Sequence, residues 1–305
     1  MSKKNAPALK ISLASIGGRG TNILSRLASI EAKNCSRVAI GNKNALRYAQ
    51  DIKHTIEVPH NAFLEKEKNA HLFDVDTLGE VSKDVKTKLE GSDIIFLIGN
   101  ITNPTNVAQA RQIAKMFHNS DSLFFYVSAT PFPFEGKAKQ QDALKGREIL
   151  VSEVDGMLVV ESEKVLSKGG SAIDAMTQVD TVIANMIDTV TELLHSFGVV
   201  NVDFADLLTT VKHAGNLYFN SVQASKNELE DIAEKVFVES YLDTSMQGIK
   251  RALYVVYAGK NVLLEEINTI GEKIKARLDD QSQIIFGLVE DKKLKDEIRV
   301  TFVGG

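Results

Sequence analysis

The sequence predicts an α/β fold with a parallel sheet covered by helices on both faces, a long central helix and a second, smaller α/β domain with a mixed sheet. Three observations predict it. Short apolar runs alternate with helical patterns in the first half of the chain, one unusually long helical pattern follows, and four further strand-like runs lie in the second half. The 305 residues are enough for two domains.

The first half of the chain alternates strands with helices. We expect helices at Asn22–Ile30 and Thr105–Phe117, and strands at Lys10–Ile16, Arg37–Ile40, Ile94–Ile98, Leu123–Val127 and Leu158–Val160. Strands separated by helices imply a parallel sheet, because a parallel pair needs a long crossover connection. The segment Asp51–Lys88 is polar and lacks a sustained period, so we expect a long excursion that is partly helical near its end.

A long helix is predicted at Ser171–Ser196, where apolar residues recur every three or four positions without proline or glycine. Beyond the stop signal at Gly198, we expect helices at Asp203–Lys212, Asn227–Leu242 and Val262–Leu278, and strands at Leu217–Ala224, Ala252–Tyr257, Gln283–Val289 and Ile298–Val303. These elements predict a first domain at residues 1–170, a central helix at residues 171–197 and a second domain at residues 198–305.

Composition and charge exclude several classes of protein. The formal net charge of -4 provides no basic field for nucleic acid or anionic lipid. Cys35 is the single cysteine, which excludes an internal disulfide and a cysteine-cluster metal site. No apolar run reaches the roughly 18 residues of a membrane span, and the polar start Met1–Lys10 is unlike a signal peptide. We therefore expect a cytoplasmic protein without direct membrane insertion.

A glycine-rich segment, Gly17–Asn22, lies between the first predicted strand and the first predicted helix. Glycine lets a phosphate approach backbone N–H groups at a helix start, so the segment predicts a phosphate site. It matches neither common nucleotide motif. The third glycine of a dinucleotide-binding loop would fall at Ile23, and the residues directly after the second strand, Gly41, Asn42 and Lys43, are not acidic. The chain also lacks the Gly-Lys-Ser/Thr of a Walker loop.

Four segments taken together resemble the FtsZ family. Gly17–Asn22 is similar to its first phosphate loop, Thr130–Gly136 to its segment ending in Phe-Glu-Gly, and Asp296–Thr301 to its closing strand. Gly198–Asp206, which contains Asn-Val-Asp-Phe-Ala-Asp, resembles the synergy loop of the family and is the most specific of the four. The matches follow the family order from about Leu9 to Gly305.

The resemblance implies an FtsZ/tubulin-like fold and a protein that binds GTP or GDP, with Mg²⁺ as a possible cofactor. It also implies that the protein assembles with itself head to tail into filaments. It also implies a split site, in which one subunit holds GTP and the synergy loop of the next subunit completes the pocket. There Asn201, Asp203 and Asp206 would polarise water or a cation at the γ-phosphate. Capping of the following helix is the alternative role, and it would account for one of the three residues.

The nucleotide contacts are carried over from the resemblance position by position. Glu135 would contact the ribose, and Lys139 stands where the family has arginine. Met176 would pack on the base, and Ser162 replaces an asparagine beside it. The base would be recognised by Asp180 or Thr181, depending on a one-residue shift, and Asp180 is the chemical candidate because a carboxylate accepts both guanine N–H groups. Two loops would hold the phosphates: Gly17, Gly18, Arg19, Gly20, Thr21 and Asn22 in the first, and Thr102, Asn103, Thr105 and Asn106 in the second.

The sequence also departs from the family. The second loop, Gly99–Asn106, keeps one glycine and is shorter, and Pro104 removes a backbone donor. The glycine-rich loop that the family has within Asp51–Lys88 is not recognisable. The sequence lacks the adaptor-binding tail of the family, so we expect any membrane attachment to use another surface or a membrane-associated partner protein.

Three hypotheses stay open. A divergent polymerising GTPase accounts for the synergy loop and the first glycine loop. A pseudo-GTPase of the same fold, a scaffold polymer with weak or no hydrolysis, accounts for the altered second loop. An unrelated dinucleotide enzyme is the third. Cell division is one of several processes that could use such a filament.

Overall fold

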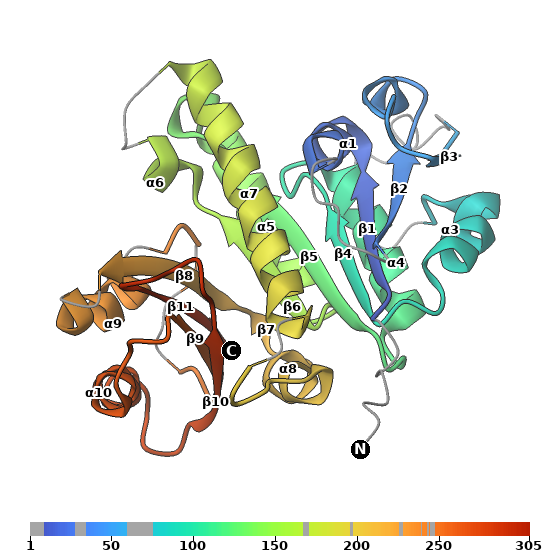
Figure 1. Ribbon diagram of the computed structural model, residues 1–305. Helices are drawn as coiled ribbons and strands as arrows, with labels where there is room; N and C mark the ends of the chain where they lie inside the picture. The colour runs from blue at the N-terminus through green and yellow to red at the C-terminus, as the bar shows by residue number, and fades with distance from the viewer. Residues whose placement is uncertain are drawn as a thin grey trace. The chain divides into compact units, whose positions relative to one another are not determined.

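The computed structural model describes residues 9–27, 35–59, 76–166, 171–195, 198–225, 228–238, 240–242, 244 and 248–305. The chain forms two compact units, Met1–Ala184 and Asn185–Gly305, and the boundary between them falls inside helix α7 (Ala172–His195) (Figure 1). The three-part division expected from the sequence stays a prediction.

The first unit contains a parallel sheet in the order β3-β2-β1-β4-β5-β6. Every residue of the central strands β1 and β4 is buried, and β4 is a continuous apolar run, as expected for a sheet covered on both faces. The bounds are β1 (Ile11–Ile16), β2 (Cys35–Gly41), β3 (His54–Glu57), β4 (Ile94–Ile98), β5 (Leu123–Ala129) and β6 (Gly156–Val160). The predicted parallel sheet is confirmed.

Helices connect these strands: α1 (Gly17–Arg26), α3 (Ser82–Leu89), α4 (Pro104–Phe117) and α5 (Lys137–Leu150), with short 3-10 turns η2 (Ala45–Tyr48), η3 (Gly79–Val81) and η4 (Pro133–Glu135). Helix α6 (Ser162–Leu166) follows β6. The helix predicted at Asn22 begins at Gly17, directly after β1. The segment expected as a glycine loop is therefore the first turns of α1. Three of the named helices and strands were not predicted, β3, α5 and α6. Strand β3 buries only Ile56, α5 is mostly polar, and α6 is only five residues long.

The order of the sheet fixes where a ligand can bind. From β1 the chain passes to β2 on one side, whereas β4 lies on the other side of β1. In open α/β sheets, ligands bind at such a switch point, outside the carboxyl ends of the strands. The segments that follow β1 and β4 begin at Gly17 and Gly99, so the two predicted phosphate loops lie side by side at this edge.

The second unit contains a mixed four-stranded sheet in the order β10-β9-β11-β8. Strand β10 runs parallel to β9, and β11 runs antiparallel to β9 and β8, which confirms the predicted mixed sheet. The strands of this sheet are β8 (Tyr218–Ser225), β9 (Arg251–Ala258), β10 (Gln283–Glu290) and β11 (Glu297–Gly304). The unit also contains the two-residue strand β7 (Gly215–Asn216), which is not part of this sheet, and the helices α8 (Phe204–Val211), α9 (Leu229–Val238) and α10 (Leu264–Lys275).

Among the described residues, no helix has both the length and the apolar character that crossing a membrane requires.

Candidate functional site

The first turn of α1 presents backbone N–H groups without a side-chain cap. Ile16 is the N-cap residue and makes no side-chain capping hydrogen bond, and Gly17 turns the chain with φ 68°, a conformation that favours glycine. The N–H groups at an uncapped helix start, together with the helix dipole, attract anions. This end of α1 is therefore suited to phosphate.

Not every residue of the predicted first loop faces a ligand. A Cβ atom on Gly20 would lie 2.3 Å from the Ile98 carbonyl oxygen, so glycine there allows α1 to pack against the end of β4. Thr21 is fully buried, and its hydroxyl donates to the Gly17 carbonyl oxygen at 2.9 Å. Gly20 and Thr21 thus hold the turn together, while Asn22 is half-buried.

The second loop is stabilised by its own side chains. The Asn100 Oδ1 atom accepts hydrogen bonds from the Thr102 N–H group at 3.0 Å and from the Thr102 hydroxyl at 2.8 Å. Asn103 caps α4 by accepting from the Asn106 N–H group at 3.0 Å. Pro104 is the first residue of α4, where its missing N–H group removes no hydrogen bond of the helix.

The two loops border one cavity of about 1200 Å³. Five of the predicted nucleotide residues line it, from both loops: Gly17, Gly18, Asn103, Thr105 and Asn106. The Asn106 side chain lies against Gly17, since a Cβ atom on that glycine would be 2.7 Å from the Asn106 amide. The structure therefore brings the phosphate-side residues of the two loops together.

The cavity also has walls that sequence analysis missed. They come from the segment after β2, including Asn42, and from the segment before α3, including the carboxylates of Asp76 and Glu80. The predicted parallel sheet could have indicated these walls, because the segments that follow neighbouring parallel strands lie at the same edge of the sheet. The glycine-rich loop sought within Asp51–Lys88 falls partly on residues 60–75, outside the described residues.

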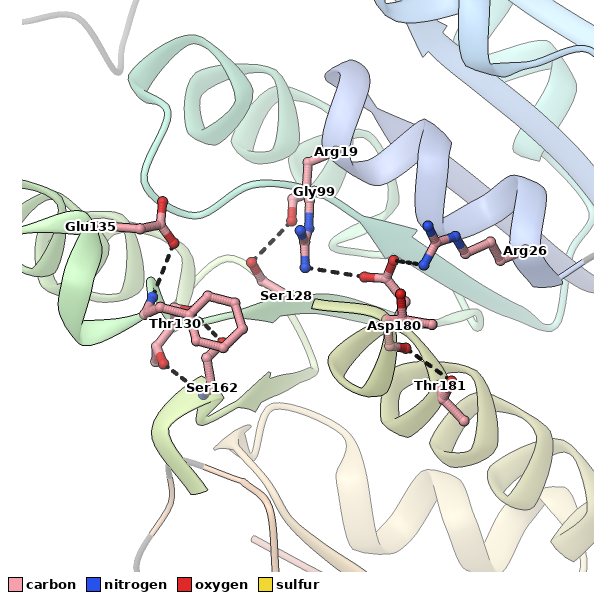
Figure 2. A network of polar contacts seen from close by, with 11 residues as sticks. Arg19, Arg26, Gly99, Ser128, Thr130, Glu135, Ser162, Asp180 and Thr181 are labelled. Carbon is pink, nitrogen blue, oxygen red and sulfur yellow. Dashed lines mark hydrogen bonds and ion pairs between the residues drawn. The ribbon is translucent and has the colours of Figure 1, made fainter. Parts of the chain in front are cut away.

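The predicted base-recognition residue Asp180 forms two ion pairs with α1. Arg19 Nη2 lies 3.1 Å from Asp180 Oδ1, and Arg26 Nη1 lies 2.7 Å from Asp180 Oδ2 (Figure 2). The Asp180 side chain is only 3% exposed. Burial raises the pKa of Asp180, and the charges of Arg19 and Arg26 oppose the rise. Thr181 is on the exposed side of α7 and donates to the Thr177 carbonyl oxygen, so Asp180 is the residue that faces α1.

The predicted ribose contact Glu135 already has two partners. Its Oε1 atom accepts from the Phe132 N–H group at 3.0 Å, and its Oε2 atom accepts from Lys139 Nζ at 2.7 Å (Figure 2). Burial raises the pKa of Glu135, but the Lys139 and Phe132 hydrogen bonds and the charges of Lys139 and Arg19 outweigh burial and lower it. Lys139, which stands where the family has arginine, is thus paired with Glu135.

The two remaining base-side residues differ in exposure. Ser162 is buried, and its hydroxyl donates to the Thr130 carbonyl oxygen at 2.6 Å while its N–H group donates to the Thr130 hydroxyl at 3.1 Å. Met176 is 43% exposed on α7. The Ser162 hydroxyl therefore already donates its proton within the protein, whereas the exposed Met176 side chain is available for apolar packing.

In the second unit, the segment Gly198–Asp206 is attached to β10. The Val199 and Val200 N–H groups both donate to the Leu288 carbonyl oxygen, at 2.7 and 3.1 Å. A Cβ atom on Gly198 would lie 2.2 Å from that oxygen, so glycine is required for this close approach.

All three residues predicted to be catalytic in this segment make local hydrogen bonds. Asn201 Oδ1 accepts from the Gly198 N–H group at 2.7 Å. Asp203 and Asp206 form a reciprocal capping box at the start of α8, in which each carboxylate accepts from the N–H group of the other, at 3.0 and 2.9 Å. Local roles thus account for all three residues, whereas the sequence led us to expect this for one. Asn201 and Asp203 are exposed and Asp206 is half-buried, so all three can be reached from solvent.

Within the described ranges, no group of three or more His, Cys, Asp or Glu side chains is arranged to hold a metal ion. Mg²⁺ that accompanies a nucleotide needs only one or two carboxylates in addition to the phosphates. Asp76 and Glu80 line the cavity, and the Asp76 Oδ1 atom already accepts hydrogen bonds from the Leu78 and Gly79 N–H groups and from the Gln112 amide.

Comparison with known proteins gives a consistent result. Residues 220–305 match the family model described as the FtsZ family, C-terminal domain. The chain is 26% identical over 315 residues to the cell division protein FtsZ of Aquifex aeolicus, covering 96% of this chain and 82% of the relative. It is 31% identical over 229 residues to the cell division protein FtsZ of Buchnera aphidicola (subsp. Baizongia pistaciae), covering 73% of this chain and 60% of the relative.

Solved structures show the same fold. An empty FtsZ dimer from M. jannaschii matches with a TM-score of 0.78 at 23% identity, covering 97% of this chain and 88% of that one. A GTPγS-bound protofilament of CetZ2 from Haloferax volcanii matches with a TM-score of 0.78 at 15% identity, covering 97% and 93%.

Proposed function

The chain is an FtsZ-like protein of the tubulin superfamily, and we propose that it binds a guanine nucleotide at the carboxyl edge of its parallel sheet and assembles head to tail into filaments. One observation carries the proposal. The uncapped start of α1, at Gly17 and Gly18, lines a cavity of about 1200 Å³ together with Asn103, Thr105 and Asn106 at the switch point of the sheet.

The chemistry of the cavity supports phosphate binding. Backbone N–H groups at the start of α1 provide donors, and the side chains of Thr105 and Asn106 add a hydroxyl and an amide. Because phosphoryl transfer depends mainly on positioning and charge stabilisation, such a cradle can hold the nucleotide without supplying the hydrolytic groups itself. Those groups would come from Asn201, Asp203 and Asp206 of a second subunit.

Head-to-tail assembly is supported by the accessibility of the segment Gly198–Asp206. Asp203 is exposed, Asp206 is half-buried, and each carboxylate has one oxygen outside the capping box. The adjacent side chains of Val199 and Val200 are 73% and 40% exposed, and neighbouring exposed apolar side chains of this kind suit a contact with a second subunit. The proposed filament acts in the cytoplasm, and cell division is the process named for the relatives.

A pseudo-GTPase that acts as a structural polymer is the second candidate, and specific contacts favour it. Thr102 is bound to Asn100, Lys139 is bound to Glu135, and the second loop has only one glycine at its edge. These three features reduce the donors available to a triphosphate. This candidate keeps the filament and loses most or all of the hydrolysis.

Turnover measured against protein concentration tests both candidates. Asparagine at positions 203 and 206 keeps capping oxygens but removes the charge, so Asp203→Asn and Asp206→Asn separate catalysis from folding. Asp231→Asn, at an exposed position of α9, controls for the loss of one surface charge.

For a polymerising GTPase, we expect turnover per subunit to rise with concentration and to collapse in Asp203→Asn and Asp206→Asn but not in Asp231→Asn. Filaments seen by electron microscopy without turnover identify the pseudo-GTPase. A folded protein that neither binds nucleotide nor forms filaments contradicts the proposal.

A further inference from the structure

Gln109 of α4 lines the cavity with a buried side-chain amide. The residue is 5% exposed, and its amide makes no hydrogen bond with any other residue in the described part of the chain. Most buried polar side chains are hydrogen-bonded, and an unpaired one costs free energy of folding. Gln109 also lies outside every segment that the family resemblance assigned to the site. Its amide is therefore available to a ligand in the cavity.

We propose that the Gln109 amide binds the terminal phosphate of the nucleotide and makes the site prefer GTP over GDP. The inference rests on the proposed function, since it presupposes that a nucleotide binds with its phosphates between α1 and α4. Gln109 would supply a donor next to the altered second loop, where the Thr102 hydroxyl already bonds Asn100.

Gln109 lies almost one helical turn beyond the place where α1 and α4 meet. The Asn106 side chain lies against Gly17 at the start of α1, since a Cβ atom on that glycine would be 2.7 Å from the Asn106 amide. At a rise of about 1.5 Å per residue, Gln109 is about 4.5 Å farther along α4 than Asn106 and on the same face. A ligand anchored at Gly17 must extend along α4 to reach Gln109, as a chain of phosphates would.

Along α4, the described lining of the cavity ends at Gln109. Almost one turn farther, the Gln112 Oε1 atom accepts from the Thr77 and Leu78 N–H groups at 3.1 and 3.2 Å. The Gln112 Nε2 atom donates to Asp76 Oδ1 at 3.1 Å. These bonds join the segment before α3 to α4. The last group of an extended ligand would therefore lie beside Gln109.

A neutral amide can select a phosphate here through directed hydrogen bonds. None of the described residues that line the cavity is a lysine, arginine or histidine, and the exposed carboxylates of Asp76 and Glu80 belong to the same lining. Side-chain charge therefore does not attract a terminal phosphate, whereas the Gln109 amide carries two N–H donors. A hydrogen bond to a charged oxygen is stronger than one between neutral groups. GTP can make this bond, and GDP would leave the amide unpaired.

Gln109→Met tests the inference, because methionine keeps the unbranched shape and the helix propensity of glutamine but has no N–H donor. Competition of GTP, GDP and inorganic tripolyphosphate against a fluorescent guanine nucleotide gives the dissociation constants. The full chain is used with Mg²⁺, below the protein concentration at which filaments form. We expect Gln109→Met to weaken GTP and tripolyphosphate at least tenfold and GDP less than twofold. The control Gln141→Met, at an exposed position of α5, should change none of them.

Thermal unfolding without nucleotide separates a ligand contact from a structural role. Because Gln109→Met removes a buried amide without a partner, we expect its Tm to equal or exceed that of the wild type. Gln112→Met breaks the bonds to Thr77 and Asp76 and should lower the Tm. A lower Tm in Gln109→Met would overturn the inference, since it would show that the amide supports the fold, for example through a bound water.

The binding data can also overturn the inference. GTP and GDP weakened equally by Gln109→Met would place the amide at another part of the nucleotide, and an unchanged GTP-to-GDP ratio would remove its role. Both results leave the proposed function standing. If Gln109→Met does not fold, Gln109→Glu repeats the comparison, because its charge should repel the terminal phosphate and weaken GTP more than GDP. A folded wild type that binds neither nucleotide and forms no filaments refutes the proposed function itself.

Discussion

Arg299 of β11 donates two hydrogen bonds to the Glu192 carboxylate of α7, at 2.9 and 2.7 Å. The Arg299 side chain is 20% exposed, and its guanidinium carbon lies 4.1 Å from the centroid of the Tyr257 ring. A two-pronged pair that also stacks on an aromatic ring uses the planar shape of arginine, which lysine cannot reproduce. The pair therefore ties the C-terminal half of α7 to the second sheet within the second unit.

We expect Arg299→Ala to lower the free energy of unfolding by about 2 kcal/mol, because it removes two charge-assisted hydrogen bonds from a partly buried pair. Arg299→Lys should lower the free energy of unfolding by about half as much, because lysine keeps the charge but not the two-pronged hydrogen bonding. Urea unfolding followed by circular dichroism measures it. The control is Lys260→Ala, which breaks an exposed pair with Glu290 at 3.9 Å and should change stability by less than about 0.5 kcal/mol. Equal losses in Arg299→Ala and Lys260→Ala would contradict the assignment.

The two glycines Gly18 and Gly20 in the first turn of α1 have different surroundings. A Cβ atom on Gly20 would meet the Ile98 backbone at 2.3 Å, while one on Gly18 would be 3.7 Å from the Tyr48 ring. We expect Gly20→Ala to destabilise the protein by about 3 kcal/mol through overpacking. Gly18→Ala should be neutral or stabilising by up to about 1 kcal/mol, because alanine favours helix. Thermal unfolding of both variants is the measurement, and the reverse order of stability would refute this packing.

Much of the fold was predictable because burial produces strong patterns. The strand Ile94–Ile98 was predicted to the residue, since five consecutive apolar residues are buried in the middle of a parallel sheet. The edge strand His54–Glu57 was missed because it buries one side chain, and α5 because only Ala143, Gly146 and Leu150 are buried along it. Pattern analysis fails where an element contributes little to the core.

The site was predictable only in part for a different reason. The glycine-rich segment after β1 can be recognised in a short stretch of sequence, so Gly17 and Gly18 were predicted as site residues, and both line the cavity. The pairing of Arg26 with Asp180 joins residues 154 positions apart, and no local pattern contains it. The start of α1 was placed five residues late because glycine is a poor helix former, and the packing of Gly20 on β4 overrides that tendency.

Cys35 is expected to react slowly with thiol reagents. Burial raises its pKa from 9.0 to about 11, although the charge of Arg37 opposes the rise. At pH 8 the thiolate fraction should then be about a hundredfold lower in the folded than in the unfolded protein, because two pKa units separate them and the thiolate is the reactive form.

Iodoacetamide labelling followed by mass spectrometry measures this ratio cleanly, because Cys35 is the single cysteine. The linked contribution to stability is present below pH 9 and is lost as the pH rises from 9 through about 11, where the unfolded thiol ionises first. Equal labelling rates at pH 8 in native buffer and in urea would show that the thiol is not protected.

The capping box at α8 predicts different effects for two substitutions at one position. Asp203→Ala removes the acceptor for the Asp206 N–H group and should cost about 1 kcal/mol, whereas Asp203→Asn keeps an acceptor and should cost less than about 0.5 kcal/mol. Urea unfolding measures both values. A turnover defect shared by the two variants would then be catalytic, and a defect confined to Asp203→Ala would reflect the lost cap.

The charge balance around Asp180 predicts a pH-dependent stability defect. Replacing Arg19 and Arg26 together by alanine leaves a carboxylate that is 3% exposed in the wild type without its two cations, which should cost about 3 kcal/mol at pH 7. Burial, which already raises the pKa of Asp180, then acts without opposition.

The sign of the pH dependence follows from that direction. A carboxyl whose pKa is higher in the folded than in the unfolded protein favours folding below its unfolded value, near 4, and loses that contribution as the pH rises through the folded value. The double variant should therefore lie closer to the wild type at pH 4 than at pH 7 in urea unfolding. Adding Asp180→Asn to the double variant should abolish this difference, because asparagine does not titrate. A defect of equal size at both pH values would mean that the two arginines stabilise α1 through their packing rather than through the charge of Asp180.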